Sequence, residues 1–230
     1  MQTNKISSIP NSQKNKLHIQ KYCTLALLSS LAFLSVIFLK IPFSGFLSLE
    51  PKDAIIVISS FIYGPVSGII MSVVVSLIEM FTISSTGPIG LIMNIISTVV
   101  FMLPATLFYK KNTSIKNIFF GLVIGTFFMV GAMILWNYLI TPLYMGIPRE
   151  TVIQMLIPIF LPFNLLKGGI NVLFVMLLLP IINVLKKSKL ISTTNNSDTK
   201  IKKRNLSIIV FSSLFVLSCV LYALVLNGTL

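Results

Sequence analysis

The amino-acid sequence predicts an all-α integral membrane protein, a bundle of membrane-spanning helices. Hydrophobic residues make up 55% of the 230 positions and charged residues only 10%. The apolar residues form long runs separated by short polar loops, which is more apolar sequence than the core of a soluble domain can use. The formal net charge of +13 comes from residues in the tails and loops. Such a distribution indicates membrane topology and contact with anionic lipid headgroups rather than nucleic-acid binding.

Four segments organise the chain. Residues 1–21 form a basic tail, 22–187 a six-helix membrane domain, 188–205 a polar linker, and 206–230 an additional C-terminal membrane segment. With this division, fourteen Lys or Arg residues fall on one side of the membrane and three on the other. Because positive charge favours the cytoplasmic side, we predict a multi-pass protein of the cell membrane. Its N-terminus is expected in the cytoplasm and its C-terminus outside.

The first predicted span, residues 24–39, carries small residues on its early turns. These residues are Ala26, Ser29, Ser30 and Ala32. Small side chains let another helix approach closely. The face can therefore dock a partner protein or pack within the chain's own bundle, and the sequence leaves both open.

A loop is expected at residues 40–53, with Asp53 as the N-cap of the next helix. The apolar stretch 54–83 that follows is long enough for one helix or for two short ones. A single span would move the next basic loop to the outer side, against the usual charge bias. We therefore predict two spans, divided at Gly64 and Pro65, with the first span short or tilted.

The third span begins with small residues at a strict spacing of four, Gly64, Gly68, Ser72 and Ser76. This spacing places them on one helical stripe, which indicates a contact face for the bundle or for a partner protein. Glu79 follows near the outer end of the span. A carboxylate inside a membrane is a functional candidate, whereas one at a helix end can simply face water or cap the helix. Both interpretations stay open for Glu79.

Three further spans complete the membrane domain. The fourth covers residues 89–108, with Asn94 as its amide, and the fifth covers 118–140. The loop 141–162 contains four prolines, so we expect it to bend back over the outer surface instead of forming a clean helix. The sixth span is predicted at 163–185.

Polar residues inside the sixth span mark a candidate site. Asn164, Lys167 and Asn171 follow a spacing of three and then four, so on a helix they share one face. Polar groups are costly in this environment. A lysine near a helix end can snorkel to the interface, but the shared face, with Gly168 beside it, favours a pocket. Asn137 lies at a similar depth near the end of the preceding span.

The sequence lacks the residue patterns of a membrane enzyme. No two of its five acids share a membrane helix, and there is no glycine-rich phosphate loop before a lysine. A single histidine argues against a histidine-based zinc site, so no metal or cofactor is expected. The remaining composition suits a cavity for a flat, largely apolar ligand with a hydrogen-bonding edge.

From about residue 22 to residue 187, the chain resembles the substrate-binding S components of energy-coupling factor (ECF) transporters, in particular their riboflavin-binding members. Four motifs in this order carry the resemblance: LEPKDAIIVISSFIYGPVSG at 49–68, SLIEMFTISSTGPIGLIMN at 76–94, WNYLITPLYMG at 136–146 and PFNLLKGGIN at 162–171. The resemblance implies a six-helix protein that binds riboflavin from outside as its transported ligand. It also implies partners, namely the transmembrane coupling protein EcfT and two cytoplasmic ATPases. The segment 206–230 lies outside the resemblance.

The resemblance also implies roles for individual residues. Asn137, Asn164 and Lys167 correspond to polar contacts with the flavin ring and the ribityl chain. The loop around Phe46, Leu47 and Glu50 resembles a lid over the pocket, and Glu79 and Asn94 complete the candidate set. The family often has an alanine-rich face on its first helix for the coupling protein, and here serine replaces alanine at part of that face. Alternatives are an S component for another vitamin, a membrane-embedded enzyme or a structural subunit.

Overall fold

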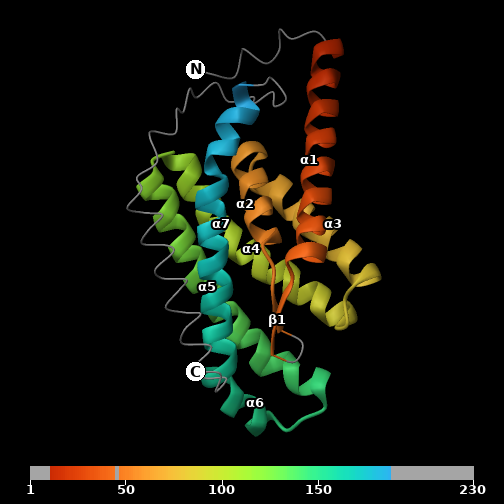
Figure 1. Ribbon diagram of the computed structural model, residues 1–230, viewed down its shortest axis with the longest axis vertical. Coiled ribbons are helices and arrows are strands. Elements are labelled where there is room, and N and C mark those ends of the chain that lie inside the picture. The colour runs from red at the N-terminus through yellow and green to blue at the C-terminus, as the bar shows by residue number, and fades with distance from the viewer. Residues whose placement is uncertain (1–10, 45–46, 188–230) are drawn as a thin grey trace.

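A computed structural model describes residues 11–44 and 47–187; the predicted segments 188–205 and 206–230 lie outside the described residues. The elements are α1 (Asn11–Leu39), β1 (Ile41–Ser44), β2 (Leu47–Leu49), α2 (Lys52–Tyr63), α3 (Pro65–Thr82), α4 (Gly87–Lys111), α5 (Ile115–Met145), α6 (Arg149–Met155), the π-helical segment η1 (Leu156–Phe160) and α7 (Leu161–Lys187). Helices α6, η1 and α7 follow one another directly and count as one helical segment. With α1 to α5, they make the described chain a six-helix bundle (Figure 1).

Five of these helical segments are long and apolar enough to cross a membrane. The exception in the described chain is α2, whose 12 residues extend about 18 Å, against a hydrocarbon core of about 30 Å. The predicted helical membrane bundle and its short second helix are thus confirmed. One departure from the all-α prediction is the antiparallel hairpin of β1 and β2, which occupies the predicted loop 40–53.

The predicted division between the second and third spans lies at Gly64. This residue separates α2 from α3 with a positive φ of 91°, a conformation that side chains with a Cβ rarely adopt. Pro65 then begins α3, a position where its missing N–H leaves no hydrogen bond unmade. The small-residue stripe that follows faces inward: Gly68, Ser72 and Ser76 are buried. A Cβ at Gly68 would lie 2.2 Å from Met102 Sδ, so this part of the stripe packs within the bundle.

The early turns of α1 divide into an inner and an outer face. Ser29 and Ala32 are buried against the bundle. Ala26 and Ser30 are exposed, and the Ser30 hydroxyl donates a hydrogen bond to the Ala26 carbonyl oxygen at 3.0 Å. Of the small α1 residues predicted to dock a partner, Ala26 and Ser30 therefore form an accessible strip, and Gly64, between α2 and α3, is half-buried.

Helices α4 and α5 approach each other closely at two glycines of α5. A Cβ on Gly125 would lie 2.3 Å from the Phe101 carbonyl oxygen. One on Gly121 would lie 2.7 Å from Phe108 Cβ and 3.1 Å from the Ala105 Cα. At Gly125 the obstacle is a backbone atom, which cannot rotate away. The spacing of four between the two glycines is typical of close helix contacts in membranes.

We predict that Gly125→Ala lowers the free energy of unfolding by about 1–3 kcal/mol, because the added methyl group forces the two helices apart. A Cβ on Gly131 of the same helix would meet nothing in the described chain within 4 Å. Gly131→Ala is therefore the matched control, and its better helix propensity should stabilise the protein by up to about 1 kcal/mol. Thermal unfolding of both variants in one detergent tests this, and equal midpoints would refute the packing argument.

The proline-rich stretch 141–162 is mostly helical, so the expectation that its prolines would prevent a clean helix is wrong. Pro142 lies inside α5 and Pro158 inside η1. Membrane helices tolerate proline where neighbouring groups or a local π turn satisfy the freed backbone groups. The chain bends once, around Gly146, which ends α5 with a φ of 64°.

Two lysines, Lys21 and Lys110, lie at one end of the bundle. The Lys21 ammonium lies 5.9 Å from the centre of the Tyr63 ring, and a Cβ placed on Gly64 would lie 3.8 Å from Lys110 Nζ. These contacts join the first half of α1, the end of α2 and the end of α4. The hairpin and α6 lie toward the opposite end (Figure 1).

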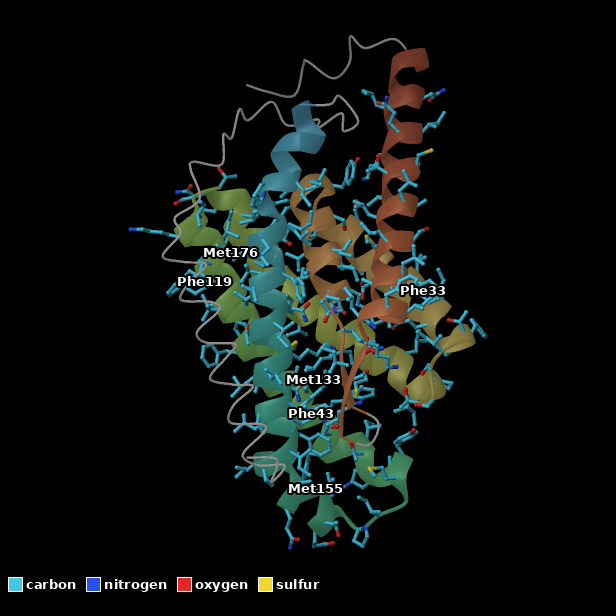
Figure 2. The ribbon with its side chains drawn as sticks, viewed as in Figure 1. Phe33, Phe43, Phe119, Met133, Met155 and Met176 are labelled. Atoms are coloured by element: carbon cyan, nitrogen blue, oxygen red, sulfur yellow. The ribbon has the colours of Figure 1, made fainter. Side chains whose placement is uncertain are left out.

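Two apolar clusters hold the bundle together. The larger cluster joins α1, α2, α3, α4, α5 and α7, and it includes the buried side chains of Met133 and Met176. The smaller one packs the hairpin residues Leu47 and Leu49 against α6, η1 and α7. Figure 2 shows Phe43 and Met155 near this hairpin end and Met176 toward the other end. The hairpin is thus fixed by its apolar face above the ends of α5 and α7.

Candidate functional site

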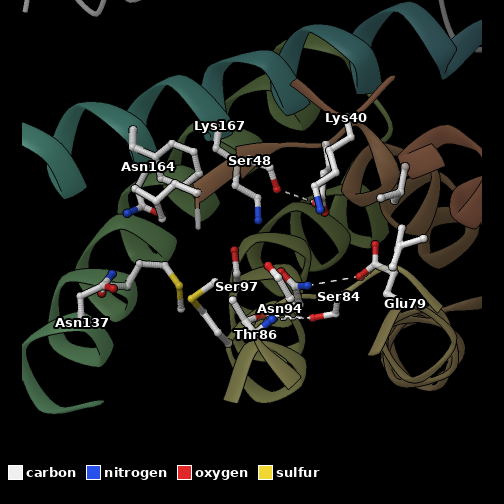
Figure 3. A pocket seen from close by; sticks show the side chains of 18 residues that line it. Lys40, Ser48, Glu79, Ser84, Thr86, Asn94, Ser97, Asn137, Asn164 and Lys167 are labelled. Atoms are coloured by element: carbon white, nitrogen blue, oxygen red, sulfur yellow. Dashed lines mark hydrogen bonds and ion pairs between the residues drawn. The ribbon is translucent and has the colours of Figure 1, made fainter. Parts of the chain in front are cut away.

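A cavity opens beneath the hairpin and is bordered by α1, the turn between α3 and α4, and helices α4, α5 and α7 (Figure 3). It encloses about 680 Å³ of atom-free space, including the part open to solvent. Its polar lining consists of Lys40, Ser48, Glu50, Glu79, Ser84, Ser85, Thr86, Asn94, Ser97, Asn137, Asn164 and Lys167. Its apolar lining consists of Val36, Leu47, Ile83, Met93, Met133 and Phe163.

The residues predicted from the sequence face this one cavity. Asn137 comes from α5, and Asn164 and Lys167 come from α7, all three buried. Leu47, Glu50, Glu79 and Asn94 also line the cavity. Phe46 lies outside the described residues. The expected convergence of these polar side chains is therefore present, whereas their role in binding stays a prediction.

Two of the three amides in the cavity wall, Asn137 and Asn164, are fixed by their own helices. Asn137 Nδ2 donates to the Met133 carbonyl oxygen and Asn164 Nδ2 to the Phe160 carbonyl oxygen, both at 2.7 Å. Thr141 Oγ1 donates to Asn137 Oδ1 at 2.9 Å. These bonds hold the amide planes in place, so that a ligand meets side chains that are already oriented.

Lys167 is held by Asp53, a residue that the local sequence pattern predicted as a helix cap. That prediction is wrong, because Pro51 occupies the N-cap of α2 without a side-chain capping bond. Asp53 instead lies in the first turn of α2, fully buried, with its Oδ2 3.6 Å from Lys167 Nζ. Thr98 Oγ1 donates to Asp53 Oδ1 at 2.6 Å. Asp53 thus supplies the counter-charge of the cavity lysine.

Asn171, the third polar residue of the predicted α7 face, lies behind the cavity. Its Nδ2 donates to the Lys167 carbonyl oxygen at 3.1 Å and to Asp53 Oδ2 at 3.4 Å. It is 1% exposed. Asn171 therefore supports the pair of Asp53 and Lys167 and does not line the cavity itself.

Lys52, which was not among the residues predicted from the sequence, joins two carboxylates that line the cavity. Its ammonium donates to Glu79 Oε1 at 2.6 Å, contacts Glu79 Oε2, and lies 2.8 Å from Glu50 Oε2. Asn94 Nδ2 donates to Glu79 Oε2 at 3.2 Å, and Ser48 Oγ donates to Glu50 Oε1 at 2.7 Å. The fully buried Lys52 therefore connects the hairpin with α3 and α4.

Glu50 remains charged despite its burial. Burial alone would raise the pKa of this carboxyl, but the ammonium groups of Lys52 and Lys167 outweigh burial and lower the pKa from 4.5 to about 2. Lys40, at the mouth of the cavity, lies 3.7 Å from Glu50 Oε1. Glu50 is consequently ionised at any physiological pH.

The charges at the cavity balance. Counted by formal charge, three carboxylates, those of Glu50, Asp53 and Glu79, form ion pairs with three lysines, Lys40, Lys52 and Lys167. A buried site of this kind has no net charge left to attract a strongly charged ligand. The described residues contain no group of three or more His, Cys, Asp or Glu side chains that could hold a metal ion. The site is suited to a neutral ligand that exchanges hydrogen bonds with amides and hydroxyls.

This fold and cavity are those of a membrane-embedded substrate-binding subunit. The sequence profile of the substrate-specific component of ECF transporters matches residues 20–179. The match covers well over half of the chain, and the chain belongs to this family.

Relatives of described function include two riboflavin transporters. The chain is 32% identical over 186 residues to the riboflavin transporter RibU of Staphylococcus aureus (strain TCH60), covering 77% of this chain and 96% of that protein. It is 30% identical over 162 residues to the riboflavin transporter FmnP of Bacillus subtilis (strain 168), covering 65% of this chain and 85% of that protein. A solved structure of the S component of a bacterial ECF transporter matches with a TM-score of 0.62 and 29% identity. That match covers 74% of this chain and 99% of the solved one.

Proposed function

We propose that this chain is the riboflavin-binding S component of an ECF importer. It binds riboflavin from outside and delivers it together with the coupling protein EcfT and two ATPases. The observation that carries the proposal is the convergence of Asn137, Asn164 and Lys167 on one cavity, in a chain whose relatives are riboflavin transporters. Riboflavin is the transported ligand, and the chain needs no cofactor of its own.

The chemistry of riboflavin supports this proposal. The vitamin is neutral, so a cavity with balanced charges can hold it without burying an unpaired ion. One edge of its flat ring carries hydrogen-bond donors and acceptors, which amide and ammonium groups can match. Phe163, Met93 and Met133 line the same cavity, and their soft, apolar side chains can cover the faces of an aromatic ring.

The distribution of lysines supports a proposed orientation in the membrane. The end of the bundle that holds Lys21 and Lys110 is proposed to face the cytoplasm, where lysines are favoured. The hairpin and the cavity then face outside, where the vitamin arrives. The exposed strip of Ala26 and Ser30 on α1 is the part of the predicted docking face that EcfT can reach. Ser29 and Ala32 of the same helix are buried, and Gly68 of α3 packs against Met102 and Ser60 inside the bundle.

Titration of the purified chain with riboflavin tests the proposal. Trp136 is the single tryptophan of the chain, and it lines a small hollow that shares Thr86 and Met93 with the main cavity. Bound flavin should therefore quench its fluorescence. We expect saturable quenching with a dissociation constant below about 1 μM, which corresponds to about −8.2 kcal/mol.

A control titration with thiamine and biotin should leave the fluorescence unchanged. Saturable binding of one of these vitamins, without binding of riboflavin, would favour an S component for another vitamin. A colourless protein that binds none of the three vitamins would contradict the assignment as a transport component. It would favour a membrane-embedded enzyme or a structural subunit.

A further inference from the structure

Ser97 places an unused hydroxyl in the wall of the cavity. It lies on α4 one helical turn after Asn94, and it is 1% exposed. Its Oγ is buried and has no hydrogen-bond partner among the described residues, although the residue lines the cavity. Figure 3 shows the Ser97 side chain directed from the α4 wall into the space that Lys167 faces from the opposite wall.

Two other buried hydroxyls of the bundle bond to their own helix. Thr106 Oγ1 donates to the Met102 carbonyl oxygen at 2.9 Å, and Thr126 Oγ1 donates to the Leu122 carbonyl oxygen at 3.0 Å. Such bonds to the preceding turn are the usual way in which a helix satisfies a buried hydroxyl. Ser97 does not use this solution. Its hydroxyl is therefore free to bond to something that enters the cavity.

The hydroxyl of Thr98, the next residue on α4, makes a bond within the protein, unlike that of Ser97. Thr98 turns away from the cavity and donates to Asp53 Oδ1 at 2.6 Å, where it helps to fix the counter-charge of Lys167. Ser97 thus has no partner among the described residues, and in the nearby pair of Asp53 and Lys167, Asp53 already accepts a bond from Thr98. A buried hydroxyl in this condition has lost its bonds to water, and a ligand atom that bonds to it recovers that loss on binding.

We propose that Ser97 is a ligand-binding residue that exchanges a hydrogen bond with a polar atom of the bound vitamin, on the wall opposite Lys167. The ligand is riboflavin, and in this respect the inference rests on the function proposed above. Ser97 can both donate and accept a bond, so it complements a neutral ring edge or a ribityl hydroxyl without adding charge to the cavity.

Ser72 offers a matched comparison. It lies on α3, is fully buried, and has an Oγ that likewise lacks a partner among the described residues, but it does not line the cavity. Removing either hydroxyl should relieve the free protein of an unsatisfied polar group. Only the removal of the Ser97 hydroxyl should affect the bound state.

The experiment compares riboflavin titrations and thermal unfolding of the unmodified chain, Ser97→Ala and Ser72→Ala. We expect Ser97→Ala to weaken riboflavin binding about tenfold while the ligand-free protein unfolds at the same or a higher temperature. Ser72→Ala should bind as the unmodified chain does. A lower affinity at an undiminished stability identifies a contact with the ligand, because a purely structural role would lower both together.

Two results would overturn the assignment in distinguishable ways. If the unmodified chain binds riboflavin and Ser97→Ala binds it within about twofold as tightly, Ser97 is not a contact, while the proposed function stands. If the unmodified chain does not bind riboflavin at all, the proposed function fails and the ligand assigned to Ser97 fails with it. Equal weakening by Ser72→Ala would also refute the assignment, because it would show a general effect of lost hydroxyls.

Discussion

A Lys52→Met variant is expected to lose about 3–5 kcal/mol of stability, the usual cost of removing one partner from a buried ion pair. Lys52 is fully buried between Glu50 and Glu79. Without its ammonium, the two carboxylates remain in the protein interior and repel each other. Thermal unfolding in detergent should show a large fall in the midpoint and a reduced yield of monodisperse protein.

Two further variants make this prediction specific. Lys111→Met removes an exposed lysine at the end of α4 and should unfold as the unmodified protein does, because exposed charges contribute little. Combining Lys52→Met with Glu79→Gln removes one of the two opposed charges and should recover part of the loss. An unchanged midpoint for Lys52→Met alone would show that the buried network does not stabilise the fold.

The Lys52 network also explains how the cavity keeps its shape. The hairpin is held on one face by the apolar contacts of Leu47 and Leu49 and on the other by the ion pair of Glu50 with Lys52. The same lysine fixes Glu79, which in turn accepts a bond from Asn94. Three walls of the cavity therefore depend on one buried side chain that does not itself line the cavity.

Much of the fold was predictable because a membrane imposes simple rules. Long apolar runs mark spans, and the charge bias correctly placed a break at Gly64. The site residues were also predictable in part. Asn164 and Lys167 stand out because polar groups inside an apolar helix are costly and share one face. The spacing of these polar residues and their energetic cost inside an apolar helix can both be read from one segment of the sequence.

The partners of the buried charges were not predictable, because they depend on contacts between distant segments. Lys52 and Asp53 are adjacent in sequence, yet Lys52 pairs with Glu79 and Asp53 with Lys167. Nothing in the sequence around them indicates these distant partners. The prediction of Asp53 as a helix cap relied on a local preference that the tertiary ion pair overrode. A pair of opposite charges at the start of a buried, apolar helix was the signal that could have suggested inward-facing partners.

The helical character of the stretch 141–162 was missed for a related reason. Proline is a strong local signal against helix, but neighbouring groups in a membrane bundle can satisfy the freed backbone groups. The π-helical segment η1 ends just before α7, and its last residue supplies the carbonyl oxygen that Asn164 Nδ2 binds. Short π-helical segments frequently lie at functional sites, which agrees with the binding role proposed for Asn164.

Replacing Lys167 by methionine is expected to weaken riboflavin binding by a factor of about 10 to 150, the equivalent of one charged hydrogen bond worth about 1.5–3 kcal/mol. The ammonium of Lys167 is the charged donor that the α7 wall presents to the cavity. Methionine keeps a similar length and an apolar stem, so the shape of the wall changes little. The loss should appear in the fluorescence titration as a higher dissociation constant with the same saturating signal.

A second variant separates this effect from folding. Lys167→Met also leaves Asp53 without its counter-charge in a fully buried position, which by itself destabilises the protein. Lys167→Met combined with Asp53→Asn removes both charges and should restore the unfolding midpoint without restoring the affinity. Lys116→Met, at an exposed position of α5, serves as the control for the loss of one positive charge. If the double variant bound riboflavin as tightly as the unmodified chain, Lys167 would be part of the buried ion network only, and the vitamin would have to be held by Asn137, Asn164 and the hydroxyls of α4.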